Sequence, residues 1–159
     1  FFAGLGAAWA MGRRASEHRP EEYATAPLGD RPAPEEIAAA IGAGRYEEAA
    51  RDYFALPSHA TRHLLTVAQG VALARWLAGH GHGDAAMVVL RRSIRDHPRD
   101  AAVAEACLLA GELLLAARQE AAAYQYFAMA LERAGQGPAA DAARRAMASL
   151  GAAPRWHRA

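Results

Sequence analysis

The stretch GRYEEAARDYFAL at residues 44–56 carries a pattern that returns twice further along the chain. GHGDAAMVVLRRS follows at residues 81–93 and RQEAAAYQYFAMA at residues 118–130, so each copy begins 37 residues after the previous one. The copies share an alanine at the sixth position and an aromatic residue or leucine at the tenth: Ala49 and Tyr53, Ala86 and Leu90, Ala123 and Phe127. A fixed period of this length indicates a repeat protein.

The segments that precede two of these copies also repeat. GVALARWL at residues 70–77 and CLLAGELL at residues 107–114 are again 37 residues apart. Their small residues Ala74 and Gly111 would let one helix approach the next closely. Each repeat is therefore predicted to be a hairpin of two helices. Because one hairpin cannot bury its apolar faces alone, the hairpins are expected to stack.

Composition supports an all-α fold. Alanine, the best helix former, accounts for 44 of the 159 residues, and residues that favour strands are few. The net charge of +1 gives the chain no general attraction for nucleic acid. The basic side chains are 18 arginines and no lysines, a choice typical of a GC-rich bacterial genome. A single cysteine, Cys107, excludes an internal disulfide and a cysteine-based zinc site.

The second helix of the first repeat resembles that of the tetratricopeptide repeat family, whose pattern there is Gly-x-Tyr-x-x-Ala-x-x-x-Phe/Tyr. The matching residues are Gly44, Tyr46, Ala49 and Tyr53. The resemblance covers about residues 34–135 and implies a right-handed superhelix of about three stacked helical hairpins plus a C-terminal capping helix. The repeat is longer than the family's usual length of about 34 residues. Gly70 and Cys107 stand where the family has tryptophan.

The apolar pattern predicts helices over residues 35–43, 60–79, 84–97, 100–117, 119–134 and 138–150, and the stretch 44–56 supplies the second helix of the first hairpin. Ser58 and Asp84 stand where they could cap the helices that follow them. The last helix is expected to turn three apolar residues inward and three charged residues to solvent: Ala143, Met147 and Leu150, and Asp141, Arg144 and Arg145. The predicted repeat domain therefore covers residues 34–150.

Residues 1–14 are expected to be the end of a transmembrane or hydrophobic helix. Residues 1–12 carry no charge, and Arg13 and Arg14 would mark the cytoplasmic side. Twelve helical residues span only about 18 Å, so the rest of a membrane span would precede residue 1. A signal-peptide core and a soluble helix are the alternatives. A Pro-rich linker is expected over residues 15–33 and a flexible tail over residues 151–159.

The opening FFAG, followed by LGAA, resembles the end of the last membrane helix of rhomboid intramembrane proteases. That helix carries a catalytic histidine, then two residues, a glycine, three residues and a second glycine, which Gly4 would match. The histidine and the first glycine would precede residue 1. The resemblance implies an alternative function, in which this domain is the cytosolic C-terminal extension of a membrane enzyme such as a rhomboid-like serine protease.

The histidines and nucleophiles of this sequence form no recognisable catalytic or metal-binding pattern. His59 and His63 would share a face of the predicted helix, but His80 and His82 lie at its far end, roughly 25–30 Å away. Zinc needs three or four ligands, so neither pair is predicted to bind metal, and the histidines are expected in solvent. Cys107 is expected on the packed face of its helix. No enzymatic activity and no cofactor are therefore expected in this chain.

The remaining candidate site is the surface of the first helices, which in the family holds an extended peptide or a partner helix. The residues predicted to be exposed there are Val71, Arg75, Leu108, Glu112 and Leu115. Some family members bind a terminal carboxylate with Lys and Asn, but this chain contains neither residue. A mixed apolar surface with one Arg and one Glu suits an amphipathic segment of a protein or peptide. Alternatively, the linker, the capping helix or a second copy of the chain covers this surface.

These features together predict a non-enzymatic protein–protein interaction scaffold. The N-terminal helix would hold it at the membrane, with the repeat domain in the cytoplasm of a bacterium. The partner would be a protein or peptide, and a homo-oligomer would be compatible with the exposed surface. No nucleic-acid partner is expected, because the charge is nearly balanced.

Overall fold

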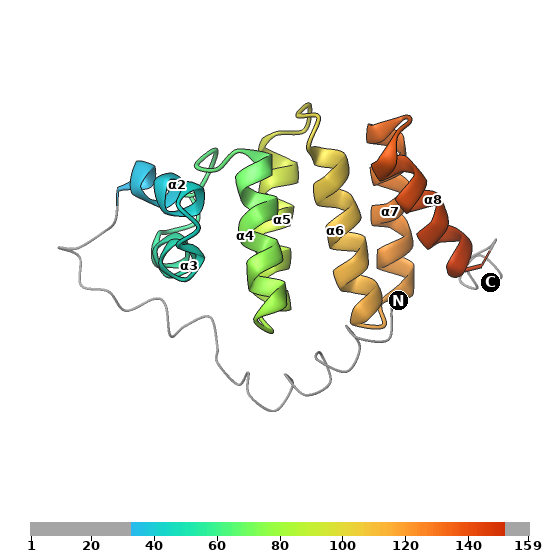
Figure 1. Ribbon diagram of the computed structural model, residues 1–159, viewed down its shortest axis with the longest axis horizontal. Coiled ribbons are helices and arrows are strands. Elements are labelled where there is room, and N and C mark those ends of the chain that lie inside the picture. The colour runs from blue at the N-terminus through green and yellow to red at the C-terminus, as the bar shows by residue number, and fades with distance from the viewer. Residues whose placement is uncertain (1–32, 152–159) are drawn as a thin grey trace.

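The computed structural model describes residues 33–151, which form seven α-helices and no β-strand (Figure 1). The helices are α2 (Pro34–Gly42), α3 (Tyr46–Ala55), α4 (Val67–Gly79), α5 (Gly83–Asp96), α6 (Val103–Ala116), α7 (Glu120–Ala134) and α8 (Pro138–Ser149). The predicted all-α class is confirmed for this part of the chain. The predicted membrane helix and nearly all of the predicted linker and of the predicted tail lie outside the described residues.

The helices pack in consecutive pairs. α2 packs against α3, α4 against α5, and α6 against α7, while α8 lies on both α6 and α7 (Figure 1). The first helices of the pairs also contact one another, because α4 packs on α2 and on α6. Contacts between successive second helices are much sparser. The first helices therefore form a continuous layer.

A left-handed residue connects the two helices of each pair at the same place in the repeat. Gly44, Gly81 and Arg118 have φ angles of 75°, 84° and 61°. The next N–H group in each case donates a hydrogen bond to the carbonyl five residues earlier, at 2.8, 2.8 and 2.9 Å. This arrangement ends the first helix and reverses the chain. The 37-residue period of the sequence is thus present in the backbone.

The predicted close approach of paired helices is also present. A Cβ atom at Gly111 would lie 2.5 Å from the Phe127 ring, and one at Gly70 would lie 2.1 Å from the Ser93 hydroxyl oxygen. Such distances are far below van der Waals contact, so glycine is required at both positions unless the partner moves. Ala74 also lies in the core and is fully buried.

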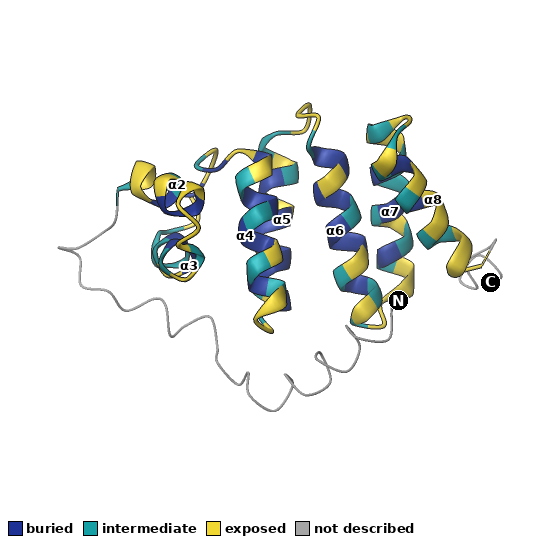
Figure 2. Cartoon of the chain, viewed as in Figure 1, coloured by how far each residue is buried: buried dark blue, intermediate teal, exposed yellow. Residues whose placement is uncertain are grey.

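One core joins all three pairs. Buried residues occur along α4, α5, α6 and α7 in Figure 2. The largest fully buried side chains are Phe127, Ile37, Leu73, Leu90, Val67, Val89, Val103 and Cys107. In α8, Ala143 is buried and Met147 is half-buried against the core, as is Leu150 directly after the helix. The three charged residues are exposed, as predicted.

The predicted start of the helix over residues 60–79 was wrong. α4 begins at Val67 instead of residue 60, and residues 58–63 form turns. Thr66 caps the helix: its hydroxyl oxygen accepts the Gln69 N–H at 3.2 Å, and the Gln69 side chain accepts the Thr66 N–H at 3.0 Å. This reciprocal pair satisfies two backbone donors that would otherwise lack partners.

Ser58 therefore does not cap a helix. Its hydroxyl accepts a hydrogen bond from Arg92 of α5 at 3.1 Å, and Arg92 also donates to the Thr61 hydroxyl at 3.0 Å. The segment between α3 and α4 is held against α5 by these bonds, which explains why it does not continue the helix. Asp84 was also predicted as a cap, but the N-cap of α5 is His82 and Asp84 lies in the first turn.

Candidate functional site

The first candidate site is the solvent side of α4 and α6. Glu105, Leu108, Glu112 and Leu115 are separated by three, four and three residues, so they lie along one side of α6. Arg75 of α4 reaches this row, and its guanidinium lies 2.7 Å from the Glu105 carboxylate. We call Arg75 and these four residues the inner face. The ion pair links the first helices of two successive repeats.

Glu112 has an unusual environment. Its side chain is open to solvent, yet desolvation by the surrounding protein raises the pKa of its carboxyl group, while Arg75 lowers that pKa. Desolvation has the larger effect, so the pKa of Glu112 is raised overall. The Arg75 guanidinium is paired with Glu105.

The structure supports part of the predicted set of exposed residues. Arg75 and Glu112 are exposed. Leu108 and Leu115 are half-buried and pack against the core. Val71 was predicted to be exposed, and this was wrong, because it retains only 4% of its accessible surface. α4 packs against α2, α3, α5 and α6, and this leaves little of its apolar surface open.

The predicted exposure of His59, His63 and His80 is confirmed, but the predicted helix at the first two was wrong. His59 and His63 are not on a helix, and His63 has a left-handed backbone with φ 55°. The His63 N–H donates to Asp96 at 3.4 Å, and its ring meets the His97 ring edge to face, with centroids 5.2 Å apart. His80 is exposed but stacks on Trp76 at 4.1 Å. Among residues 33–151, no cluster of three potential metal ligands occurs.

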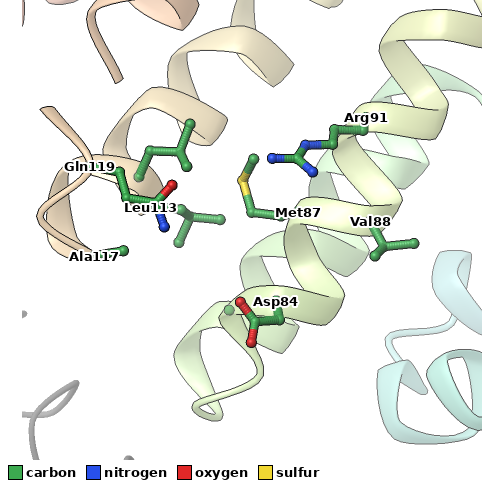
Figure 3. A pocket seen from close by; sticks show the side chains of 9 residues that line it. Asp84, Met87, Val88, Arg91, Leu113, Ala117 and Gln119 are labelled. Carbon is green, nitrogen blue, oxygen red and sulfur yellow. The ribbon is translucent and has the colours of Figure 1, made fainter. Parts of the chain in front are cut away.

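A second candidate site is a cavity between α5 and the C-terminal end of α6 (Figure 3). Its volume is about 240 Å³. The apolar part of its wall consists of Gly83, Met87, Val88, Leu113, Leu114 and Ala117, and the polar part of Asp84, Arg91 and Gln119. Val88 is the exposed large apolar residue of the described chain. Sequence analysis did not identify this site.

Comparisons with known proteins give no assignment. No family model, no curated protein and no solved structure matches this chain. The side chains at the two candidate sites therefore carry the functional argument. None of the helices between residues 33 and 151 is both long enough and apolar enough to cross a bilayer.

The thiol of Cys107 has the chemistry of a packed residue. It lies fully buried in α6, as predicted, and burial raises its pKa to about 11. A thiol with a pKa this high carries almost no thiolate at neutral pH, and the thiolate is the nucleophilic form. The chemistry available at the inner face and at the cavity consists of ion pairing, hydrogen bonding and apolar contact, which suits binding.

Proposed function

We propose that this chain is a non-enzymatic scaffold that binds a protein or peptide on its inner face. The observation that carries the proposal is the Arg75–Glu105 pair across α4 and α6, beside the exposed Glu112. These charges lie next to the half-buried Leu108 and Leu115. Such a surface is complementary to an amphipathic segment, whose apolar side chains would contact the leucines while its polar groups meet the charges.

The repeat arrangement is proposed to be that of the tetratricopeptide family. Three features support it: paired helices, a left-handed connection every 37 residues, and first helices that contact one another while second helices diverge. We propose that these pairs form a right-handed superhelix whose hollow side is the inner face. α8 would act as the capping helix, because it buries Ala140 and Ala143 against the last pair and exposes Arg144 and Arg145.

We also propose, from the sequence alone, that residues 1–14 attach this domain to a membrane with the repeats in the cytoplasm. The support is the uncharged stretch of residues 1–12, followed by Arg13 and Arg14. Protease treatment of spheroplasts tests this arrangement. Digestion of the repeat domain in intact spheroplasts would contradict it, and digestion only after lysis is the expected result.

The inner face is tested by a charge swap, Arg75→Glu with Glu112→Arg. Both side chains are exposed and the net charge is unchanged, so the swap should leave the melting temperature within a few degrees of wild type. Cross-linked partners captured in cells by the full chain should be lost from the swap variant. The matched control is Glu47→Arg with Arg51→Glu on the exposed side of α3, which should keep them. Equal capture by the folded swap variant would rule out the inner face as the binding surface.

A further inference from the structure

The cavity between α5 and α6 has a counterpart 37 residues earlier, between α3 and α4. Three cavity residues, Gly83, Leu113 and Ala117, correspond by the repeat period to Tyr46, Trp76 and His80. In the earlier interface these three rings form a stack. The Tyr46 and Trp76 centroids lie 6.4 Å apart with the rings inclined by 22°, and the Trp76 and His80 centroids lie 4.1 Å apart.

The interface between α5 and α6 has none of these three rings. Glycine, leucine and alanine replace them, and the cavity of about 240 Å³ lies at these three residues. The first helices of the two interfaces end in the same way, since Gly81 and Arg118 are both left-handed residues that follow α4 and α6. The cavity therefore occupies the place that an aromatic stack fills one repeat earlier.

We propose that this cavity binds an aromatic side chain, tryptophan or tyrosine, of a partner protein. The ring would take the place that Tyr46, Trp76 and His80 fill in the preceding interface. Figure 3 shows Met87 and Arg91 extending from α5 toward the side of the cavity formed by Leu113 and Gln119. Thioether sulfur and guanidinium groups both make favourable contacts with aromatic rings.

The polar wall supplies partners for the polar atom of such a ring. A buried indole N–H or phenol O–H normally finds a hydrogen-bond partner, and the Asp84 carboxylate and the Gln119 amide are available for it. Within residues 33–151, neither Asp84 nor Arg91 is engaged in an ion pair. Both side chains can therefore turn to an incoming group without breaking an existing interaction.

The size of the cavity favours a single side chain over a whole small molecule. Pockets for drug-sized ligands usually have volumes of about 300–1,000 Å³, above the value found here. Aromatic residues inserted into small pockets are frequent anchors of protein interfaces. The cavity shares no residue with the inner face, so this site does not depend on the proposed function.

The test uses the full chain with labelled methyl groups and two probes, N-acetyltryptophanamide and N-acetylleucinamide. The tryptophan probe should produce saturable shifts in the methyl resonances of Met87 and Leu113, while those of Met129 and Met147, which do not line the cavity, stay in place. The leucine probe should produce no saturable shift. Equal responses to both probes, or no response to either, would overturn the proposal.

Variants that restore the missing rings should close the site. Leu113→Trp and, separately, Ala117→His each reintroduce the ring present one repeat earlier, and each should abolish the shifts of Met87. Ala117 is the residue after α6 and is half-buried, so the histidine variant should fold even where the larger tryptophan does not. Ala116→His is the matched control, because Ala116 is exposed and does not line the cavity. Undiminished probe binding by folded Ala117→His would contradict the proposal.

Discussion

Gly111 lies so close to Phe127 that a Cβ atom at residue 111 would come within 2.5 Å of the phenyl ring. α6 and α7 therefore pack with the bare backbone of one helix against a fully buried ring of the other. The equivalent residues one repeat earlier are Ala74 and Leu90. The larger side chain on the second helix is accompanied by the smaller one on the first, so the two positions compensate each other in volume.

Gly111→Ala should destabilise the protein, although alanine is the better helix former. The added methyl group would overlap the Phe127 ring, and overpacking a buried site typically costs about 1–3 kcal/mol. The gain in helix propensity, about 1 kcal/mol, offsets only part of this cost. Urea denaturation followed by circular dichroism measures the change in the free energy of unfolding.

Two further variants isolate the cause. Gly79→Ala, at a helical glycine with open space around it, should leave the stability unchanged or raise it. The double variant Gly111→Ala with Phe127→Leu has the same two residue types as Ala74 and Leu90 one repeat earlier. It should recover part of the lost free energy of unfolding. If Gly111→Ala proved as stable as wild type, the close packing of α6 on Phe127 would be wrong.

Thr66→Ala should cost about 1 kcal/mol, because it removes the side-chain oxygen that accepts the Gln69 N–H. Substitution by alanine at an exposed turn residue that caps no helix should have little effect on stability. His59→Ala is a suitable control, since His59 is exposed and lies outside α4. Thermal melts of both variants decide where the helix begins. Equal melting temperatures would support a start near residue 60 instead of Val67.

The repeat period accounts for what the sequence predicted about the fold. Small and apolar residues at fixed spacing locate the helix pairs, because helix packing depends on which faces are apolar and which positions are small. The approach of α6 to α7 at Gly111 was predicted in this way. Six of the seven helix positions also follow from this pattern, to within three residues of their observed ends.

The segment before α4 was mispredicted because its structure depends on contacts distant in sequence. Arg92, which is 31 residues away from Thr61, holds the turn, and Ser58 bonds to the same guanidinium. The repeat pattern also wrongly predicted that Val71 is exposed. Its burial depends on how many helices surround α4, which the pattern within one repeat does not show. The cavity was missed although the repeat alignment contained the signal, namely that Trp76 has Leu113 as its counterpart.

Asp96→Asn should lower the free energy of unfolding at neutral pH. It should also make that free energy fall less steeply as the solution is acidified. Burial raises the pKa of Asp96, but bonds from the Arg95 side chain and the His63 N–H together outweigh this effect, and the pKa is lowered from the ordinary 3.8. A lowered pKa means that the charged form stabilises the folded state above pH 3.8, and that this stabilisation is lost as the pH falls through the folded-state pKa. The expected cost of the substitution at pH 7 is about 1–2 kcal/mol.

The measurement for Asp96 is the free energy of unfolding between pH 2 and pH 7. The wild type should lose stability more steeply than Asp96→Asn below pH 4, so the two curves should converge in acid. Asp84→Asn removes an exposed carboxylate that is in no ion pair with the described residues and serves as the control for the loss of one negative charge. Parallel curves for Asp96→Asn and wild type would show that the pair with Arg95 does not stabilise the fold.

Arg118→Gly should stabilise the protein. Arg118 has φ 61° at the position where the two earlier repeats carry Gly44 and Gly81. A left-handed conformation costs a residue with a side chain roughly 1–2 kcal/mol, and glycine avoids this cost while losing somewhat more chain entropy on folding. The expected net gain is about 0.5–1 kcal/mol in urea denaturation. Ala117→Gly, at the preceding residue with φ −79°, should instead reduce stability, because only the entropy loss remains there. A less stable Arg118→Gly would mean that the connection between α6 and α7 does not share the backbone of the two earlier connections.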